Sequence, residues 1–153
     1  GSRVRFNYTM MGDSVNLAAR CESGAKAYGV YTMVAAPTLL AAQRTVTNLN
    51  YRKLDRIVVK GRTDSIEVYE LWDTVVDLER AMACRERYEA GLDLYFVGNW
   101  AAALEKFKEA ESYEPSQSFA PTTPSTVLAK RCQEFIEHGG PENWDGAYRM
   151  RTK

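Results

Sequence analysis

The sequence has few cysteines, a single histidine and no long apolar stretch, and each shortage excludes a class of protein. Its three cysteines are scattered and lack Cys-x-x-Cys spacing, so neither a disulfide framework nor a zinc site is expected. His138 has no Cys, Asp or Glu partner at ligand spacing, and we interpret it as a helix-end residue. No stretch approaches the roughly 20 apolar residues of a membrane helix, and no secretory leader opens the chain. We expect a soluble, cytoplasmic fragment without membrane contact.

The sequence also lacks an excess of charge of either sign. Twenty Lys and Arg residues balance twenty Asp and Glu residues, which gives a formal net charge of zero. Domains that bind nucleic acids usually carry a clear positive excess, so we expect no nucleic-acid partner. An anionic ligand must therefore be bound by a local group of residues. The hydrophobic content of 45% is sufficient for a packed core.

The first 72 residues alternate between strand and helix patterns. In chain order they predict a strand over Arg3–Met11, a helix from Asp13 or Ser14 to a left-handed stop at Gly29, a strand over Val30–Ala35, a short helix from Pro37 to about Gln43, and a hairpin of the strands Tyr51–Lys60 and Ser65–Trp72. This order indicates an α+β fold.

After Trp72 the period of the apolar residues changes from two to about 3.6, which indicates an all-helical part. Thr74 with Asp77 resembles a capping box, and residues 87–115 predict two helices of about twelve residues joined at Gly98-Asn99. The small and aromatic positions resemble a single tetratricopeptide repeat; they are Ala90, Gly91, Leu94, Gly98, Trp100, Ala103, Phe107, Ala110 and Pro115. One repeat cannot bury its own apolar face, so we expect the hairpin to contact the first domain or another protein chain.

A loop rich in proline, serine and threonine follows over residues 116–124. A third helix is predicted over Thr126–Glu137, and the glycines before Pro141 end it ahead of an irregular tail. We interpret Trp144 and Tyr148 in that tail as packing anchors.

The stretch most informative about function is Arg5-Phe-Asn-Tyr-Thr-Met-Met-Gly-Asp-Ser-Val-Asn-Leu-Ala-Ala-Arg20. Asn16 and Arg20 are four residues apart, so they share one helix face and can point at one ligand. Such a pair alone is usually just solvated, and only the complete pattern favours a functional interpretation. That pattern resembles the hairpin and helix of class III adenylyl and guanylyl cyclases, whose signature is an aromatic-containing strand, Gly-Asp or Gly-Asn, and Val-Asn-x-Ala-x-Arg.

This resemblance implies roles for four residues. The family's matching asparagine positions the ribose and its arginine steadies charge on the α-phosphate, which makes Asn16 and Arg20 the candidate catalytic residues. The stretch Leu54-Asp-Arg-Ile-Val-Val-Lys-Gly61 resembles the family's late strand that ends in Val-Lys-Gly. The family uses that lysine to bind triphosphate, which makes Lys60 a candidate, although Lys-Gly alone is common in hairpins. Thr9 stands where the family reads the base, and it resembles the bacterial subgroup that reads adenine with a hydroxyl. ATP is therefore favoured over GTP, although Thr9 is also a good strand former.

The family's metal ligands have no counterpart in this sequence. Family cyclases hold two Mg²⁺ or Mn²⁺ ions with two aspartates that lie upstream of the motif where this chain begins. Asp13 is better explained as a helix cap and Asp55 as a strand residue, so no metal is expected on this chain's own ligands. The isolated fragment is then expected to be inactive. Because family sites form between two catalytic domains, the expected partners are ATP and a second cyclase domain, in a homodimer. An unpaired sheet edge would also favour such pairing.

The expected fold is thus α+β, with a partial ferredoxin-like nucleotidyl cyclase half-domain over residues 1–72. A helical hairpin follows over residues 73–115, and a loop, a third helix and a tail over residues 116–153. The tail, Pro141-Glu-Asn-Trp-Asp-Gly-Ala-Tyr148, resembles the C-terminal extension of membrane-tethered bacterial cyclases, which allows a membrane anchor in the parent protein. The expected function is conversion of ATP to cyclic AMP and pyrophosphate in intracellular signalling. A guanylate cyclase and a non-catalytic module that binds a protein through the hairpin are the alternatives.

Overall fold

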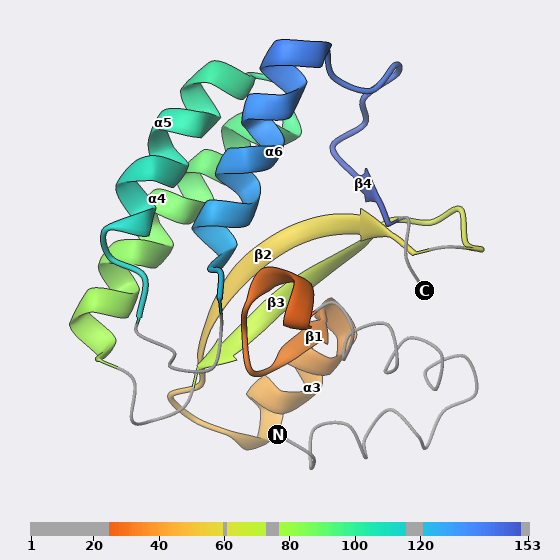
Figure 1. The fold of residues 1–153 in the computed structure, drawn as a ribbon. Coiled ribbons are helices and arrows are strands. Elements are labelled where there is room, and N and C mark those ends of the chain that lie inside the picture. Colours follow the sequence, from red (N-terminus) through yellow and green to blue (C-terminus); the bar gives the residue numbers. More distant parts are fainter. Residues whose placement is uncertain (1–24, 60, 73–76, 116–120, 151–153) are drawn as a thin grey trace. The chain divides into compact units, whose positions relative to one another are not determined.

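The computed structural model describes residues 25–59, 61–72, 77–115 and 121–150. The chain divides into two compact units, one of residues 1–74 and 148–153 and one of residues 75–147. The first contains a sheet and the second is helical, so the predicted α+β class is confirmed (Figure 1). Within the described ranges, no helix has the length and apolar character needed to cross a membrane.

The first unit is built on a four-stranded mixed sheet with the strand order β1-β3-β2-β4. Its strands are β1 (Met33–Ala35), β2 (Asn50–Val58), β3 (Ile66–Trp72) and β4 (Tyr148–Arg149). β1 and β2 each pair antiparallel with β3, so the predicted hairpin of β2 and β3 is confirmed. β4 pairs parallel with the end of β2, where the N–H of Met150 also donates to the carbonyl of Val58 at 2.9 Å. The tail was expected to be irregular, and a strand of two residues is too short to leave a period in the sequence.

The helix that precedes β1 ends at Gly29, as the sequence predicts. Residues 25–28 are helical and Gly29 has a φ of 76°. The N–H of Val30 donates to the carbonyl of Ala25 at 2.9 Å, and that of Gly29 to the carbonyl of Lys26 at 3.2 Å. These two bonds form a Schellman motif, which satisfies carbonyls that a helix end otherwise leaves unpaired. The end of this helix is therefore firmly defined.

The short helix α3 (Ala36–Thr45) follows β1 directly. Pro37 lies in its first turn, where a missing N–H costs nothing because first-turn N–H groups have no partner within the helix. The helix begins one residue before the predicted start and extends beyond the predicted end at Gln43. Leu39 is the buried residue of α3, and β2 is the next element in the chain.

The second unit consists of the helices α4 (Leu78–Phe96), α5 (Trp100–Glu111) and α6 (Pro124–His138). Asp77 caps α4 by accepting a hydrogen bond from the N–H of Arg80 at 3.2 Å. The capping-box pattern had indicated Thr74 as this cap. The structure assigns the role to Asp77, and Thr74 lies outside the described residues. Gly98, with a φ of 84°, makes the predicted turn, and Asn99 caps α5.

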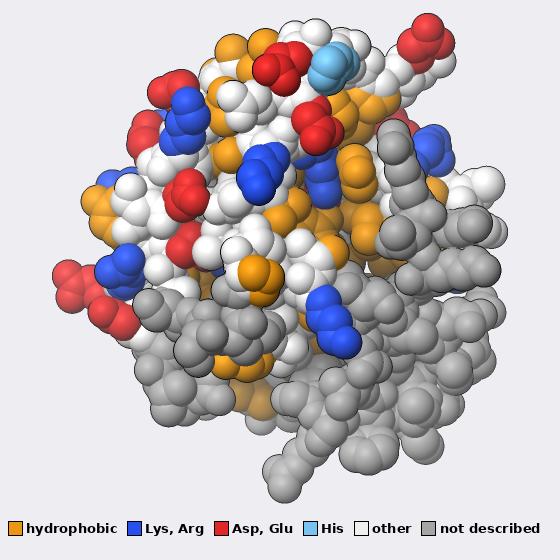
Figure 2. All heavy atoms as spheres, in the orientation of Figure 1, with side chains coloured by type: hydrophobic (Ala, Val, Ile, Leu, Met, Phe, Trp, Pro, Cys, Tyr) orange, Lys and Arg blue, Asp and Glu red, His pale blue; other side chains and the backbone are white. Residues whose placement is uncertain are grey.

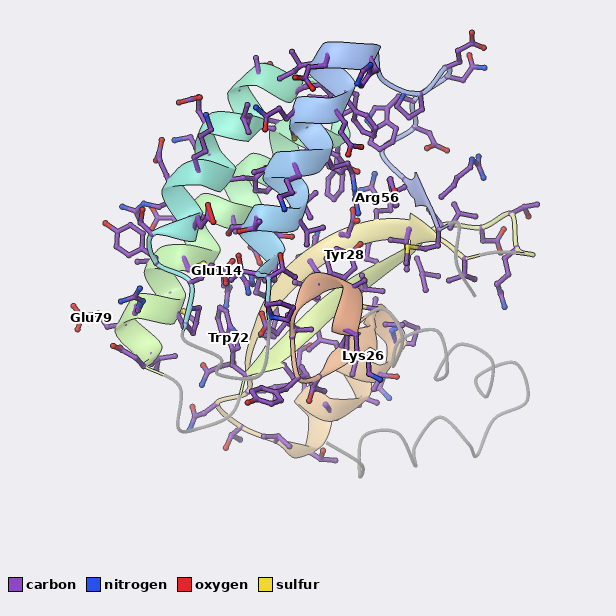
Figure 3. The ribbon with its side chains drawn as sticks, viewed as in Figure 1. Lys26, Tyr28, Arg56, Trp72, Glu79 and Glu114 are labelled. Atoms are coloured by element: carbon purple, nitrogen blue, oxygen red, sulfur yellow. The ribbon has the colours of Figure 1, made fainter. Side chains whose placement is uncertain are left out.

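Helix α6 covers the face that a single helical hairpin leaves open. α5 packs against both α4 and α6 (Figure 1). The predicted contact of the hairpin with the first domain or with another chain stays a prediction, whereas the packing of α6 on α5 was not predicted. The buried carboxylate of Glu114, labelled in Figure 3, accepts hydrogen bonds from the N–H and hydroxyl of Ser125 at 3.1 and 2.6 Å. These bonds fix the first turn of α6 to the end of the hairpin.

Aromatic rings fill the far end of the helical unit. The ring of Tyr95 lies 5.2 Å from that of Trp144 and 5.6 Å from that of Trp100, measured between centroids. The indole N–H of Trp144 donates to the carbonyls of Tyr95 and Phe96, both at 3.1 Å. Trp144 is thus a packing anchor, as expected. His138 is the last residue of α6, in agreement with its interpretation as a helix-end residue.

Gly91 gives a direct test of the packing between α4 and α5. A Cβ atom at this position would lie 2.9 to 3.1 Å from three ring atoms of the buried Phe107. In an unhindered helix, alanine is about 1 kcal/mol more favourable than glycine. Here we expect Gly91→Ala to destabilise the unit by about 1–3 kcal/mol, since overpacking outweighs helix propensity.

Chemical denaturation of Gly91→Ala, Phe107→Leu and the double variant measures this effect. The smaller leucine should relieve the contact, so the double variant should be more stable than the sum of the two single changes predicts. A stabilising Gly91→Ala would show that the two helices are not so closely packed.

Candidate functional site

The four residues that the sequence assigns to a nucleotide site all lie outside the described residues. Thr9, Asn16 and Arg20 fall in residues 1–24, and Lys60 falls between two described ranges. The structure does describe the segments that flank them. Residues 25–28 are the end of the helix on which Asn16 and Arg20 are predicted, and Lys60 follows β2 and Val59 in the chain. The roles of all four residues therefore stay predictions.

A buried hydrogen bond joins these two flanking segments. The hydroxyl of Tyr28 donates to Oδ2 of Asp55 at 2.5 Å. Tyr28 is the last residue of the helix that precedes β1, and Asp55 lies in β2. Tyr28 is 1% exposed and Asp55 is fully buried. Figure 3 shows the labelled Tyr28 beside β2.

A second bond and an irregularity of β2 fix the carboxylate of Asp55. The backbone N–H of Arg56 donates to Oδ1 of Asp55 at 2.7 Å. The pairing of β2 with β3 shifts between Lys53 and Asp55, which is a β-bulge or a similar irregularity. Such irregularities bend a strand and redirect its side chains. Both carboxylate oxygens of Asp55 thus accept hydrogen bonds from the protein itself.

The described residues do not fit a divalent metal ion. In the described ranges no three His, Cys, Asp or Glu side chains are grouped so that they could hold one. Asp55 binds a tyrosine hydroxyl and a backbone N–H, which agrees with the structural role expected for a strand residue. Asp13 lies outside the described residues. No metal-dependent step is assigned to these residues.

The same hairpin contains a buried ion pair that was not predicted from the sequence. Arg52 and Glu70 are 0% and 2% exposed. Nε and Nη2 of Arg52 donate to Oε1 of Glu70 at 3.1 and 2.5 Å. The guanidinium carbon also lies 5.3 Å from the ring centroid of Trp72. The two residues are direct cross-strand partners, and opposite charges at paired positions were the signal available.

A second cross-strand pair, Arg56 and Glu67, is more exposed. Nη2 of Arg56 lies 3.3 Å from Oε2 of Glu67, and both side chains are 31% exposed. Partial burial acts to raise the pKa of Glu67, but Lys53, the hydroxyl of Tyr69 and Arg56 together outweigh it. The pKa of Glu67 is therefore lower than its ordinary value. This pair is a natural reference for the buried one.

The described surface carries charges of both signs. On the face shown in Figure 2, Lys and Arg side chains are interspersed with Asp and Glu side chains over the helical unit. Neighbouring residues on the helices form ion pairs, such as Arg85 with Glu89 at 3.7 Å. This mixture agrees with the net charge of zero, and the described residues on the face shown form no extended basic area.

Comparison with known proteins connects both units to one group of enzymes. The chain is 27% identical over 139 residues to "Adenylate cyclase, terminal-differentiation specific" of Dictyostelium discoideum. The matched stretch covers 90% of this chain and 6% of that protein. It is 33% identical over 86 residues to "Adenylate cyclase 1" of Rhizobium meliloti, which covers 56% of this chain and 12% of that protein. The chain is distantly related to adenylate cyclases.

This chain spans only a small part of each relative. Neither matched stretch can fit within residues 1–74, so each similarity extends into the helical unit. No protein-family model and no solved structure matches the chain.

Proposed function

We propose that this chain is part of an adenylate cyclase that converts ATP to cyclic AMP and pyrophosphate. The observation that carries the proposal is the similarity to the Dictyostelium adenylate cyclase over 90% of the chain. The motif that ends in Arg20 supports it, because its order of residues is the one expected for a cyclase helix. In this proposal the isolated chain is inactive. In the complete enzyme it acts together with a second catalytic domain, in a homodimer.

The proposed residues supply positioning and charge. In the reaction, the ribose 3′-oxygen attacks the α-phosphorus, the bond from that phosphorus to the bridging oxygen breaks, and pyrophosphate leaves. Asn16 orients the ribose, Arg20 stabilises the charge that develops on the α-phosphate oxygens, and Lys60 binds the triphosphate. Phosphoryl transfer is catalysed mainly by such positioning and electrostatic stabilisation. A bound Mg²⁺ or Mn²⁺ ion would offset the triphosphate charge. The described residues would not supply the ligands of that ion.

Thr9 is proposed to favour adenine. Its hydroxyl can accept a hydrogen bond from the exocyclic amine of adenine or donate one to a ring nitrogen. The reaction product would serve intracellular signalling, and a membrane anchor in the parent protein would be compatible with this role.

Assay of the full parent enzyme with ATP and with GTP, in the presence of Mn²⁺, tests the proposal. We expect cyclic AMP as the main product and a loss of about 100-fold in activity for Asn16→Ala, since misplacing the reacting groups by about 1 Å has an effect of that size. Gln43→Ala removes an exposed amide from α3 and should leave activity unchanged.

Three results would count against the proposal. A wild-type enzyme that forms no cyclic nucleotide would refute the function. A preference for GTP would refute the choice of base, and full activity of Asn16→Ala would refute the site.

A further inference from the structure

The bond between Tyr28 and Asp55 links two segments that lead, along the chain, to two different groups of the proposed site residues. Arg20 lies upstream of Tyr28 in the chain and is predicted on the helix that ends at Gly29. Lys60 lies downstream of Asp55, just beyond the end of β2. In this proposal, the distance between the two groups of site residues depends on how this helix end is held against β2.

The geometry of the bond is suited to holding the helix end in a fixed position against the strand. A 2.5 Å separation between a hydroxyl and a carboxylate oxygen is typical of a charge-assisted hydrogen bond, which is stronger and more directional than a neutral one. Both partners are buried, so water does not compete for the bond.

Each partner is also fixed on its own element. The Schellman motif of Ala25, Lys26, Gly29 and Val30 holds the helix end that carries Tyr28. The N–H of Arg56 holds the second oxygen of Asp55. A movement of either element is thereby passed to the other.

We propose that Tyr28 and Asp55 are positioning residues, which set the helix predicted to carry Asn16 and Arg20 against the strand that leads to Lys60. This inference rests on the proposed function. Neither residue touches the nucleotide in this account, and both act through the groups that they place. Loss of the bond should therefore lower kcat more than it raises the KM for ATP, because the transition state is more sensitive to misplacement than substrate binding is.

Tyr28→Phe in the full parent enzyme tests the inference, since it removes only the hydroxyl. We expect kcat to fall by about 10- to 100-fold with the KM for ATP changed by less than about threefold, as is typical of a small misplacement. Tyr69→Phe is the matched control. It removes a tyrosine hydroxyl that donates to a carboxylate, Glu67, at 3.1 Å, but this bond lies within β3 and joins no two elements.

Asp55→Asn separates positioning from the charge of the carboxylate. Its single amide oxygen can accept from the N–H of Arg56 while its NH2 group donates to the hydroxyl oxygen of Tyr28, so a bond between the two elements can persist without the charge. We therefore expect Asp55→Asn to retain more kcat than Asp55→Ala, which removes both bonds. Equal losses in the two variants would overturn the inference. A Tyr28→Phe enzyme whose kcat matches that of Tyr69→Phe, at a temperature where both are folded, would also overturn it.

Hydrogen exchange on this chain supplies a readout that does not need activity. Tyr28→Phe should speed the exchange of backbone amides both in residues 25–30 and in residues 55–59, whereas Tyr69→Phe should leave residues 25–30 unchanged. Unchanged exchange in either segment of Tyr28→Phe would overturn the inference. An inactive wild-type enzyme whose Tyr28→Phe variant shows coupled exchange would refute the proposed function and leave the link between the two segments established.

Discussion

Replacing Arg20 with alanine is expected to lower the kcat of the parent enzyme by about 10³- to 10⁵-fold, the range measured for transition-state arginines in phosphoryl transfer. The KM for ATP should change by less than about tenfold, because the guanidinium acts mainly on charge that develops in the transition state. Single-turnover and steady-state assays of cyclic AMP formation measure the two parameters separately.

Two further variants sharpen this result. Arg20→Lys keeps the charge but loses the planar, bidentate fork of the guanidinium, so we expect only a partial recovery of kcat. Arg44→Ala removes an exposed arginine from the last turn of α3 and should have no effect on kcat. If Arg20→Ala raises the KM and leaves kcat intact, Arg20 binds substrate uniformly and does not stabilise the transition state.

The largest expected effect on stability comes from the buried pair of Arg52 and Glu70. Glu70→Leu would leave the guanidinium of Arg52 without its carboxylate in a site that is 0% exposed. Breaking a buried ion pair in this way typically costs about 3–5 kcal/mol. Chemical denaturation, followed by hydrogen exchange of the backbone amides of β2 and β3, measures the loss.

The same hairpin provides the control for this prediction. Arg56 and Glu67 are also cross-strand partners of β2 and β3, but they are 31% exposed. Solvent screens such a pair, so Glu67→Gln should cost no more than about 1 kcal/mol. The double change Arg52→Met with Glu70→Leu should recover most of the stability, since it removes both buried charges together. A Glu70→Leu protein as stable as Glu67→Gln would show that water reaches the guanidinium of Arg52.

Local sequence patterns predicted much of the fold because the structures involved depend on few residues. The alternation of Ile66 and Val68 with polar neighbours helped to predict the hairpin of the strands Tyr51–Lys60 and Ser65–Trp72, which the structure forms as β2 and β3. Gly29 and Gly98 identified two helix ends because each adopts a positive φ that favours glycine. The start of α4 was placed too early, since both Thr74 and Asp77 are good capping residues and only the fold shows which one accepts a hydrogen bond.

For the candidate site, the sequence supplied the proposed site residues and the structure supplied the bond between Tyr28 and Asp55. Thr9, Asn16, Arg20 and Lys60 were found from a motif, and the described residues do not test them. Asp55 was weighed as a metal ligand and interpreted as a strand residue, but its partner Tyr28 lies 27 residues away in the chain. No local pattern signals a contact between residues so far apart, so the positioning bond could be found only in three dimensions.

The sequence alone thus determined the α+β class, the change from sheet to helices after Trp72, and the motif that relates the chain to nucleotide cyclases. These features are carried by near neighbours, through the two-residue and 3.6-residue periods and through single turn residues. Only the tertiary structure decided that α6 covers α5, that β4 extends the sheet, that Arg52 and Glu70 are buried together, and that Tyr28 holds Asp55. Each of these contacts joins residues distant in the chain, and the free energy that selects them comes from burial and pairing, which appear only once the chain has folded.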